Sequence, residues 1–262
     1  MTRGGSESLR IGCVQYLNAQ PLIFGWPGEV VFDHPSTLCR KLADGELDVA
    51  FVSSFEFLRM PVYTIVDGVA LAADGAVHSV FVAHDAPIEE IDEIALDPAS
   101  LTSVNLVRCL LAERQLKPRR VAASSDLSPV ISGGRARLMI GDQAIRFREK
   151  HATQCHFWDL GAEWKRLTGL PFVFALWLIR PGVPMAQAIA DQLRGTRDQN
   201  LADIGNVIAA QDGFTPEFCA YYFSECLRFG FGEAEKSGLL RFRSLCEEHG
   251  ILTPNAEPLR LV

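Results

Sequence analysis

Short runs of apolar residues alternate along the chain with longer segments in which apolar residues recur every three or four positions. The short runs have the length of buried strands, and the longer segments have the period of helices packed on a sheet. Strands that alternate with helices in this way are typical of an α/β fold. We expect strands at 9–14, 29–33, 48–52, 62–66, 77–83, 94–96, 120–122, 138–140, 156–158 and 172–179.

Helices are expected in the intervals between these strands. The clearest covers 97–116, whose leucines share one face behind a start rich in serine and threonine. Ser53 and Glu56 have the spacing of a capping box that opens a short helix. Further helices are expected at 35–48, 141–150 and 161–169, then from beyond Pro184 to about 210, from 215 to about 229 and from 233 to about 249.

The order of these elements predicts two α/β lobes. The first lobe would hold residues 1–83 and the helical C-terminal tail 180–262, and the second lobe, 84–179, would be inserted between them. The strands at 77–83 and 172–179 would cross between the lobes as a double hinge. This arrangement is a clamshell, which closes on a ligand by hinge bending.

Composition narrows the range of functions. The 262 residues are 48% hydrophobic, enough for a sizeable core, and carry a formal net charge of −7. No block of lysine and arginine forms a stripe, so we expect no nucleic-acid partner. No apolar run reaches the roughly 18 residues that span a bilayer, and the first ten residues lack the apolar core of a secretory signal. We therefore expect a cytoplasmic protein without membrane insertion, whose seven scattered cysteines are reduced.

Polar residues gather where four of the predicted strands give way to helices. Open α/β sheets bind small ligands at such strand ends. Hydroxyls, an amide and helix N-termini form an array of neutral donors that suits a carboxylate or a phosphate. Local donors are needed because an acidic chain offers an anion little long-range attraction. The candidates are Tyr16, Asn18, Ser53, Ser54, Ser100, Thr102, Ser103, Gly141 and Asp142, with Ser79 on a crossing strand at the floor of the cleft.

Several candidates also have a purely structural interpretation. Ser53 and Asp142 can be N-caps, Thr102 and Ser103 can start a helix, and Asn18 can belong to a turn. Their shared position at strand ends favours a ligand site over these separate explanations.

The sequence offers few catalytic groups. It lacks the motifs of a nucleophile elbow, a zinc protease, a phosphate-binding loop and a dinucleotide site. Of six histidines, only His78 falls near the inferred cleft, and neighbours on a strand such as His78 and Ser79 face opposite sides. We therefore expect no metal and no organic cofactor. The residues alone favour a small-anion site, in an enzyme or in a binding protein.

Seven motifs between residue 9 and the last helix point to a known family. They are "YLNAQPL", "GELDVAFVSSFEF", "VHSV", "IALDPASLTSVNLVRCLL", "LMIGDQAI", "DLGAEWKRLTGLPFVFALW" and "GLLRFRSLCEEHGIL". With them the chain resembles the chorismate dehydratases of the futalosine route to menaquinone. The resemblance implies a two-lobed fold like that of type II periplasmic binding proteins. It also implies a hydro-lyase that removes water from chorismate to give 3-[(1-carboxyvinyl)oxy]benzoate.

The resemblance also implies roles for the candidates. Asn18 and Ser79 would belong to the active centre, and Thr102 with Ser103 would hold one carboxylate of chorismate. The serine pair at 53–54, or the Gly141 backbone, would hold the other carboxylate. Since protein bases are few, the enolpyruvyl carboxylate of the substrate would itself take the proton while the enzyme fixes its geometry.

Two other functions stay open at this point. One is a sister enzyme that makes 1,4-dihydroxy-6-naphthoate on the same fold, which would need a histidine in the cleft. The other is a binding module without catalysis, because fold does not fix function. The aromatic tail around 218–223 could cap the first lobe or pair two chains as a homodimer.

Overall fold

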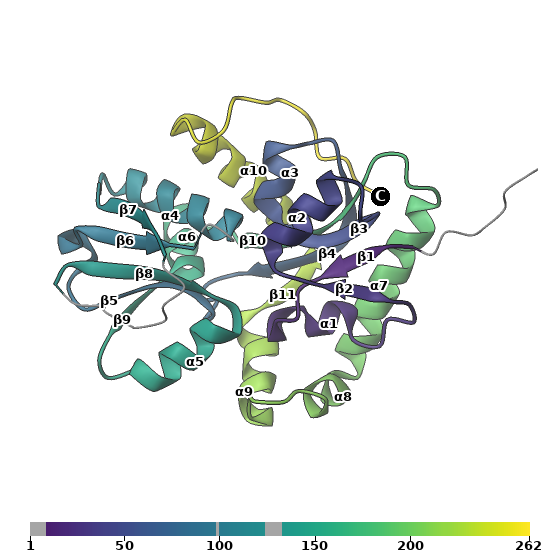
Figure 1. Ribbon diagram of the computed structural model, residues 1–262, viewed down its shortest axis with the longest axis horizontal. Coiled ribbons are helices and arrows are strands. Elements are labelled where there is room, and N and C mark those ends of the chain that lie inside the picture. The colour runs from purple at the N-terminus through teal and green to yellow at the C-terminus, as the bar shows by residue number, and fades with distance from the viewer. Residues whose placement is uncertain (1–8, 98–99, 124–132) are drawn as a thin grey trace, which may run out of the picture.

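The computed structural model describes residues 9–97, 100–123 and 133–262. The chain forms two lobes, each built on its own mixed sheet (Figure 1). The expectation of a two-lobed α/β fold with a helical C-terminal end is confirmed. None of the helices within the described ranges is long and apolar enough to cross a membrane.

The first sheet has six strands in the order β11-β4-β10-β3-β1-β2. β1 pairs in parallel with β2 and β3, whereas β10 lies antiparallel between β3 and β4. The strands are β1 (Ile11–Cys13), β2 (Val30–Phe32), β3 (Val49–Ser53), β4 (Thr64–Ala73), β10 (Phe172–Ile179) and β11 (Arg228–Phe231).

The second sheet has five strands in the order β7-β6-β8-β5-β9. β6 pairs in parallel with β7 and β8, and β5 lies antiparallel between β8 and β9. The strands are β5 (Val80–His84), β6 (Glu93–Leu96), β7 (Arg119–Ala122), β8 (Arg135–Ile140) and β9 (His156–Asp159).

The helices divide between the two lobes and the region between them (Figure 1). Around the first sheet lie α1 (Gln20–Ile23), α2 (Pro35–Ala43), α3 (Ser54–Arg59), α7 (Ala186–Ala202), α8 (Ile204–Ala209), α9 (Pro216–Tyr221) and α10 (Glu233–Glu248). Around the second lie α4 (Leu101–Glu113), α5 (Gly141–His151) and α6 (Leu160–Thr168).

The expected crossing strands are not what connects the lobes. β5 pairs only within the second sheet, and β10 only within the first. The reason is that both strands are almost entirely apolar, and such a strand is best buried between two neighbours in the middle of a sheet. The chain passes between the sheets instead through the short segments before β5 and before β10. The lobe boundaries at 83/84 and 179/180 stay a prediction.

The C-terminal region also differs from the expected run of helices. The stretch expected as one helix over 215–229 begins as α9, continues as a π-helical turn at Tyr222–Cys226, and ends in β11. β11 adds to the free edge of β4, a partner that is distant in sequence and leaves no local pattern.

Apolar packing joins the two lobes on one side of the molecule. Trp164 of α6 contacts the rings of Phe172 in β10 and Phe242 in α10 at 5.1 and 6.0 Å. Nearby, the thiols of Cys109 in α4 and Cys246 in α10 lie 3.6 Å apart. All five side chains are buried. This apolar seam holds α4 against the first lobe, and the start of α4 forms one wall of the site described next.

Candidate active site

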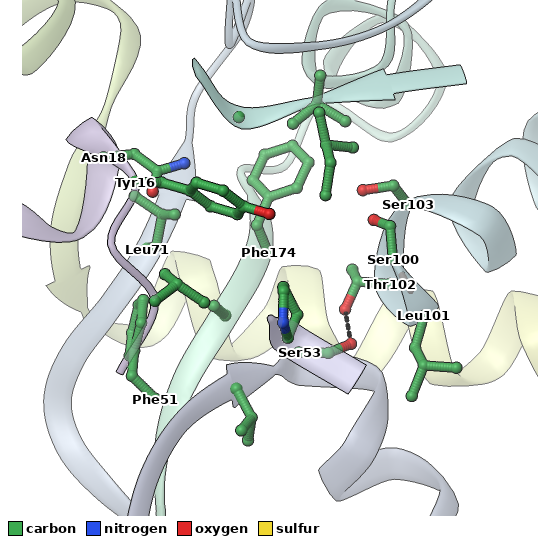
Figure 2. A pocket seen from close by; sticks show the side chains of 17 residues that line it. Tyr16, Asn18, Phe51, Ser53, Leu71, Ser100, Leu101, Thr102, Ser103 and Phe174 are labelled. Carbon is green, nitrogen blue, oxygen red and sulfur yellow. Dashed lines mark hydrogen bonds between the residues drawn. The ribbon is translucent and has the colours of Figure 1, made fainter. Parts of the chain in front are cut away.

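A pocket lies between the lobes, where the starts of α3, α4 and α5 meet the turn after β1 (Figure 2). Its empty space, the opening to solvent included, is about 550 Å³. Hydroxyls and one amide interrupt an otherwise apolar wall. The lining comprises Val14, Tyr16, Asn18, Pro35, Phe51, Val52, Ser53, Leu71, Val80, Ser100, Leu101, Thr102, Ser103, Ile140, Gly141, Phe174 and Ala175.

Seven of the ten expected site residues therefore line one pocket. Figure 2 shows Tyr16 and Asn18 on one side, and Ser100, Thr102 and Ser103 facing them from the other. Ser53 and Gly141 complete the set. The apolar floor, with Phe51, Leu71 and Phe174, was not expected as part of the site, because apolar strand residues carry no signal that separates them from ordinary core.

The first wall is a short turn that follows β1. Residues Leu17–Ala19 form a single 3-10 turn, and Pro21 lies in the first turn of α1, where its missing N–H is not needed. The side chain of Asn18 is only 7% exposed, and its Oδ1 atom has no hydrogen-bond partner among the described residues. A buried amide oxygen without a partner is costly in a folded protein. A bound ligand would remove that cost.

Tyr16 presents its phenol to the centre of the pocket (Figure 2). Burial raises the pKa of Tyr16, and the nearby carboxylates of Asp97 and Asp142 raise it further. The phenol therefore keeps its proton at neutral pH and can act as a hydrogen-bond donor.

The opposite wall is the start of α4. The hydroxyl of Thr102 lies 2.5 Å from the Ser53 hydroxyl, 3.3 Å from that of Ser54, and accepts a hydrogen bond from the Phe55 N–H at 3.2 Å. Ser54 lies behind these groups and donates to the carbonyl of Val173 at 2.7 Å. This network joins the starts of α3 and α4, whose N–H groups have no partner within their own helices. The pocket thus receives the positive ends of helix dipoles.

The expected capping box at α3 is not formed. The Ser53 side chain makes no capping bond, and its hydroxyl turns to Thr102 instead. Glu56 forms a two-pronged ion pair with Arg59, at 2.7 and 2.8 Å. Ser53 thus bonds across to α4 and Glu56 bonds within α3, so the Ser53 hydroxyl faces the pocket and not the helix backbone.

Gly141 allows the two lobes to approach closely. Its φ angle is +65°, and a Cβ atom built there would lie 3.2 Å from the ring of Tyr16. Its N–H donates to the carbonyl of Ser79 at 2.9 Å. Glycine is the residue that accepts both the left-handed backbone and the ring packed against it.

Asp142 lies outside the pocket lining that the structure describes. α5 begins one residue earlier, at Gly141, and the Asp142 carboxylate accepts a hydrogen bond from the N–H of Leu17 at 2.9 Å. This bond joins α5 to the turn after β1 across the cleft. Asp142 therefore holds the mouth of the pocket together, a contact that neither of its sequence-based interpretations contained.

Asp142 should make stability depend on pH. Burial raises the pKa of Asp142, although the Leu17 N–H and Arg146 partly oppose this. The unfolded carboxyl ionises near pH 4, about 3.9 for a free side chain, whereas the folded one resists ionisation. The protonated Asp142 carboxyl therefore contributes fully to the free energy of unfolding below the unfolded pKa. This contribution is lost as pH rises through the raised folded pKa. We expect Asp142→Asn to gain stability over the wild type as pH rises through this window.

Urea unfolding at a series of pH values measures this effect. Asp212→Asn, at an exposed carboxyl, is the control, and its curve should stay parallel to the wild type. If the unfolding free energies of the wild type and Asp142→Asn changed in parallel with pH, Asp142 would not be the source of the pH dependence.

Ser79 is placed differently from our expectation of a cleft floor. It is completely buried, it is not one of the lining residues, and its hydroxyl accepts a hydrogen bond from Tyr222 at 2.6 Å. Its neighbour His78 packs against Phe218, with ring centroids 5.4 Å apart. From the sequence, Tyr222 was expected only as part of the aromatic tail, because nothing in the local pattern shows where its hydroxyl points.

Two curated relatives cover most of the chain. The chorismate dehydratase of Thermus thermophilus is 29% identical over 255 residues, which cover 88% of this chain and 93% of the relative. The chorismate dehydratase of Campylobacter jejuni is 26% identical over 234 residues, covering 88% and 91%.

Solved structures share the fold. A protein of Archaeoglobus fulgidus superposes with a TM-score of 0.69 at 18% identity, covering 93% of this chain and 98% of that one. The periplasmic aliphatic sulphonate binding protein of Escherichia coli superposes with a TM-score of 0.63 at 14% identity, covering 94% of both chains. These likenesses establish a fold of the periplasmic-binding-protein type. The family model described as menaquinone biosynthesis matches residues 9–248, and the chain belongs to that family.

Proposed function

We propose that this protein is a chorismate dehydratase, a hydro-lyase that converts chorismate to 3-[(1-carboxyvinyl)oxy]benzoate and water. The observation that carries the proposal is the neutral pocket between the lobes, lined by hydroxyls and helix starts. The names of the two relatives support the same reaction. The reaction is redox-neutral and needs no cofactor.

The two carboxylates of chorismate match the donors in the pocket. Thr102 and Ser103 lie in the first turn of α4, where backbone N–H groups and hydroxyls can bind one carboxylate. The second set of donors comes from Ser53 and from the first turn of α5, which begins at Gly141. Neutral donors in an apolar pocket bind an anion more strongly than they would in water.

The reaction breaks a C–H and a C–O bond of the ring. The C3 proton passes to an acceptor, the electrons of that C–H bond form the new ring double bond, and the C4 hydroxyl leaves. The proton departs with the hydroxyl as water, so the product keeps both carboxylates. The polar groups in the described lining are a phenol, hydroxyls and an amide. We therefore assign proton acceptance to the enolpyruvyl carboxylate of chorismate, held near C3 by the enzyme.

Asn18 and Tyr16 are suited to the departing hydroxyl. The protonated phenol of Tyr16 can donate a hydrogen bond to it, which weakens the C4–O bond. The amide of Asn18 lies in the same wall and can orient either this hydroxyl or the enolpyruvyl carboxylate. Asn18 is our candidate for a residue in contact with the reacting atoms. Ser79 lies outside the described lining and acts, in this proposal, only through its neighbours.

Incubation with chorismate tests the function. We expect the ring diene absorbance to be replaced by that of an aromatic ring, and the mass of the small molecule to fall by one water. Bound but unchanged chorismate would indicate a binding protein instead. Chorismate that neither binds nor changes would refute the proposal and leave the naphthoate synthase to be tested with its own substrate.

A further inference from the structure

One buried hydroxyl links three segments around the pocket. Tyr222 lies in the π-helical turn of the C-terminal region and is completely buried. Its hydroxyl donates to the hydroxyl of Ser79 at 2.6 Å, and the amide of Asn18 lies beside the phenol, whose pKa it lowers. Ser79 in turn accepts the N–H of Gly141 through its carbonyl. The phenol thus reaches the turn after β1 and the segment before β5, and through Ser79 the start of α5.

Two of the linked residues belong to the pocket and two do not. Asn18 and Gly141 line it, and they come from opposite lobes, whereas Ser79 and Tyr222 are outside the described lining. A shift of the phenol would therefore move both walls at once. The amide of Asn18 would be affected most, because its Oδ1 atom has no hydrogen-bond partner among the described residues that could hold its orientation.

The ring of Tyr222 has a separate role from its hydroxyl. It stacks on Phe218 at 5.6 Å and lies 6.1 Å from Phe223. These contacts are made by carbon atoms and would be retained by phenylalanine. Burial raises the pKa of Tyr222 far above its usual value, so the hydroxyl stays neutral and donates at any pH the folded protein tolerates.

We infer that Tyr222 is a positioning residue for the dehydration. Its hydroxyl keeps Asn18 and the Ser79–Gly141 pair in fixed positions on the two sides of the cleft. This inference rests on the proposed function. Tyr222 does not touch the substrate, so its loss should alter the reaction step more than the binding of chorismate.

Tyr222→Phe tests the inference. We expect kcat to fall about tenfold to a hundredfold, as is usual when a reacting group is slightly misplaced, with KM changing far less. Tyr63→Phe is the matched control, because Tyr63 is equally buried and its hydroxyl has no hydrogen-bond partner in the described structure. That variant should keep the wild-type kcat. Thermal unfolding of both variants shows whether a change in kcat accompanies a general loss of structure.

Ser79→Ala and the double variant with Tyr222→Phe complete the experiment. If both hydroxyls act through one bond, the double variant should be no slower than the slower single variant. A wild-type kcat in Tyr222→Phe, losses that multiply in the double variant, or an equal loss in Tyr63→Phe would each overturn the inference. Wild-type protein that leaves chorismate unchanged would refute the proposed function instead, and the two failures are therefore distinguishable.

Discussion

Replacing Gly141 with alanine is expected to lower kcat/KM for chorismate about a hundredfold while the protein still folds. The new methyl group would lie 3.2 to 3.3 Å from three atoms of the Tyr16 ring. Either the ring or the start of α5 must then move, and both line the pocket. Steady-state kinetics with chorismate, together with a melting temperature, measures the effect.

Gly169→Ala separates the contact with Tyr16 from backbone strain. Gly169 has a φ angle of +72°, close to that of Gly141, but a Cβ atom there would meet nothing within 4 Å. Both variants should lose roughly 1–2 kcal/mol of stability from the left-handed backbone. Only Gly141→Ala should lose activity. Equal activity of the two variants would show that the approach of Tyr16 to α5 is unimportant for the reaction.

Thr102→Val is the second change with a large expected effect. Valine keeps the shape of the side chain but removes the hydroxyl shared by Ser53, Ser54 and the Phe55 N–H. Buried polar groups left without a partner should lower the free energy of unfolding by about 1–3 kcal/mol. The loss of donors aimed at a substrate carboxylate should reduce kcat/KM by a further factor of about 10²–10³. Urea unfolding and kinetics on chorismate measure the two effects separately.

Thr168→Val is the control for this change. The Thr168 hydroxyl also makes two hydrogen bonds, to the carbonyl of Trp164 at 2.9 Å and from the N–H of Leu170 at 3.1 Å, but it is not among the residues that line the pocket. Its loss should cost stability and leave kinetics unchanged. If Thr102→Val behaved in the same way, Thr102 would be a structural link between α3 and α4 and no part of the binding site.

Much of the pocket could be predicted because strand ends are visible in sequence. A buried run that stops at a polar residue marks where a strand reaches the edge of its sheet, and Tyr16, Ser53 and Ser100 follow such runs. The helices that begin at Leu101 and Gly141 show in addition where backbone N–H donors point into the pocket. These signals are local, so they can be recognised without knowledge of the fold.

The contacts that could not be predicted from the sequence are those between distant segments. Asp142 bonds to Leu17, 125 residues away, and Tyr222 bonds to Ser79, 143 residues away. The separation into two sheets decided where β5 and β10 pair, and tertiary pairing overrode the helical pattern at β11. Local pattern fixes which residues end a strand, but long-range packing decides which of them face the pocket.

The aromatic cluster of Trp164, Phe172 and Phe242 bears on how the protein is completed during synthesis. Phe242 is supplied by α10, whereas Trp164 belongs to α6, a helix that is synthesised much earlier. As the nascent polypeptide leaves the ribosome, the surface that Trp164 presents stays bare until α10 emerges. Translation products that stop before α10 would therefore leave this surface uncovered by Phe242.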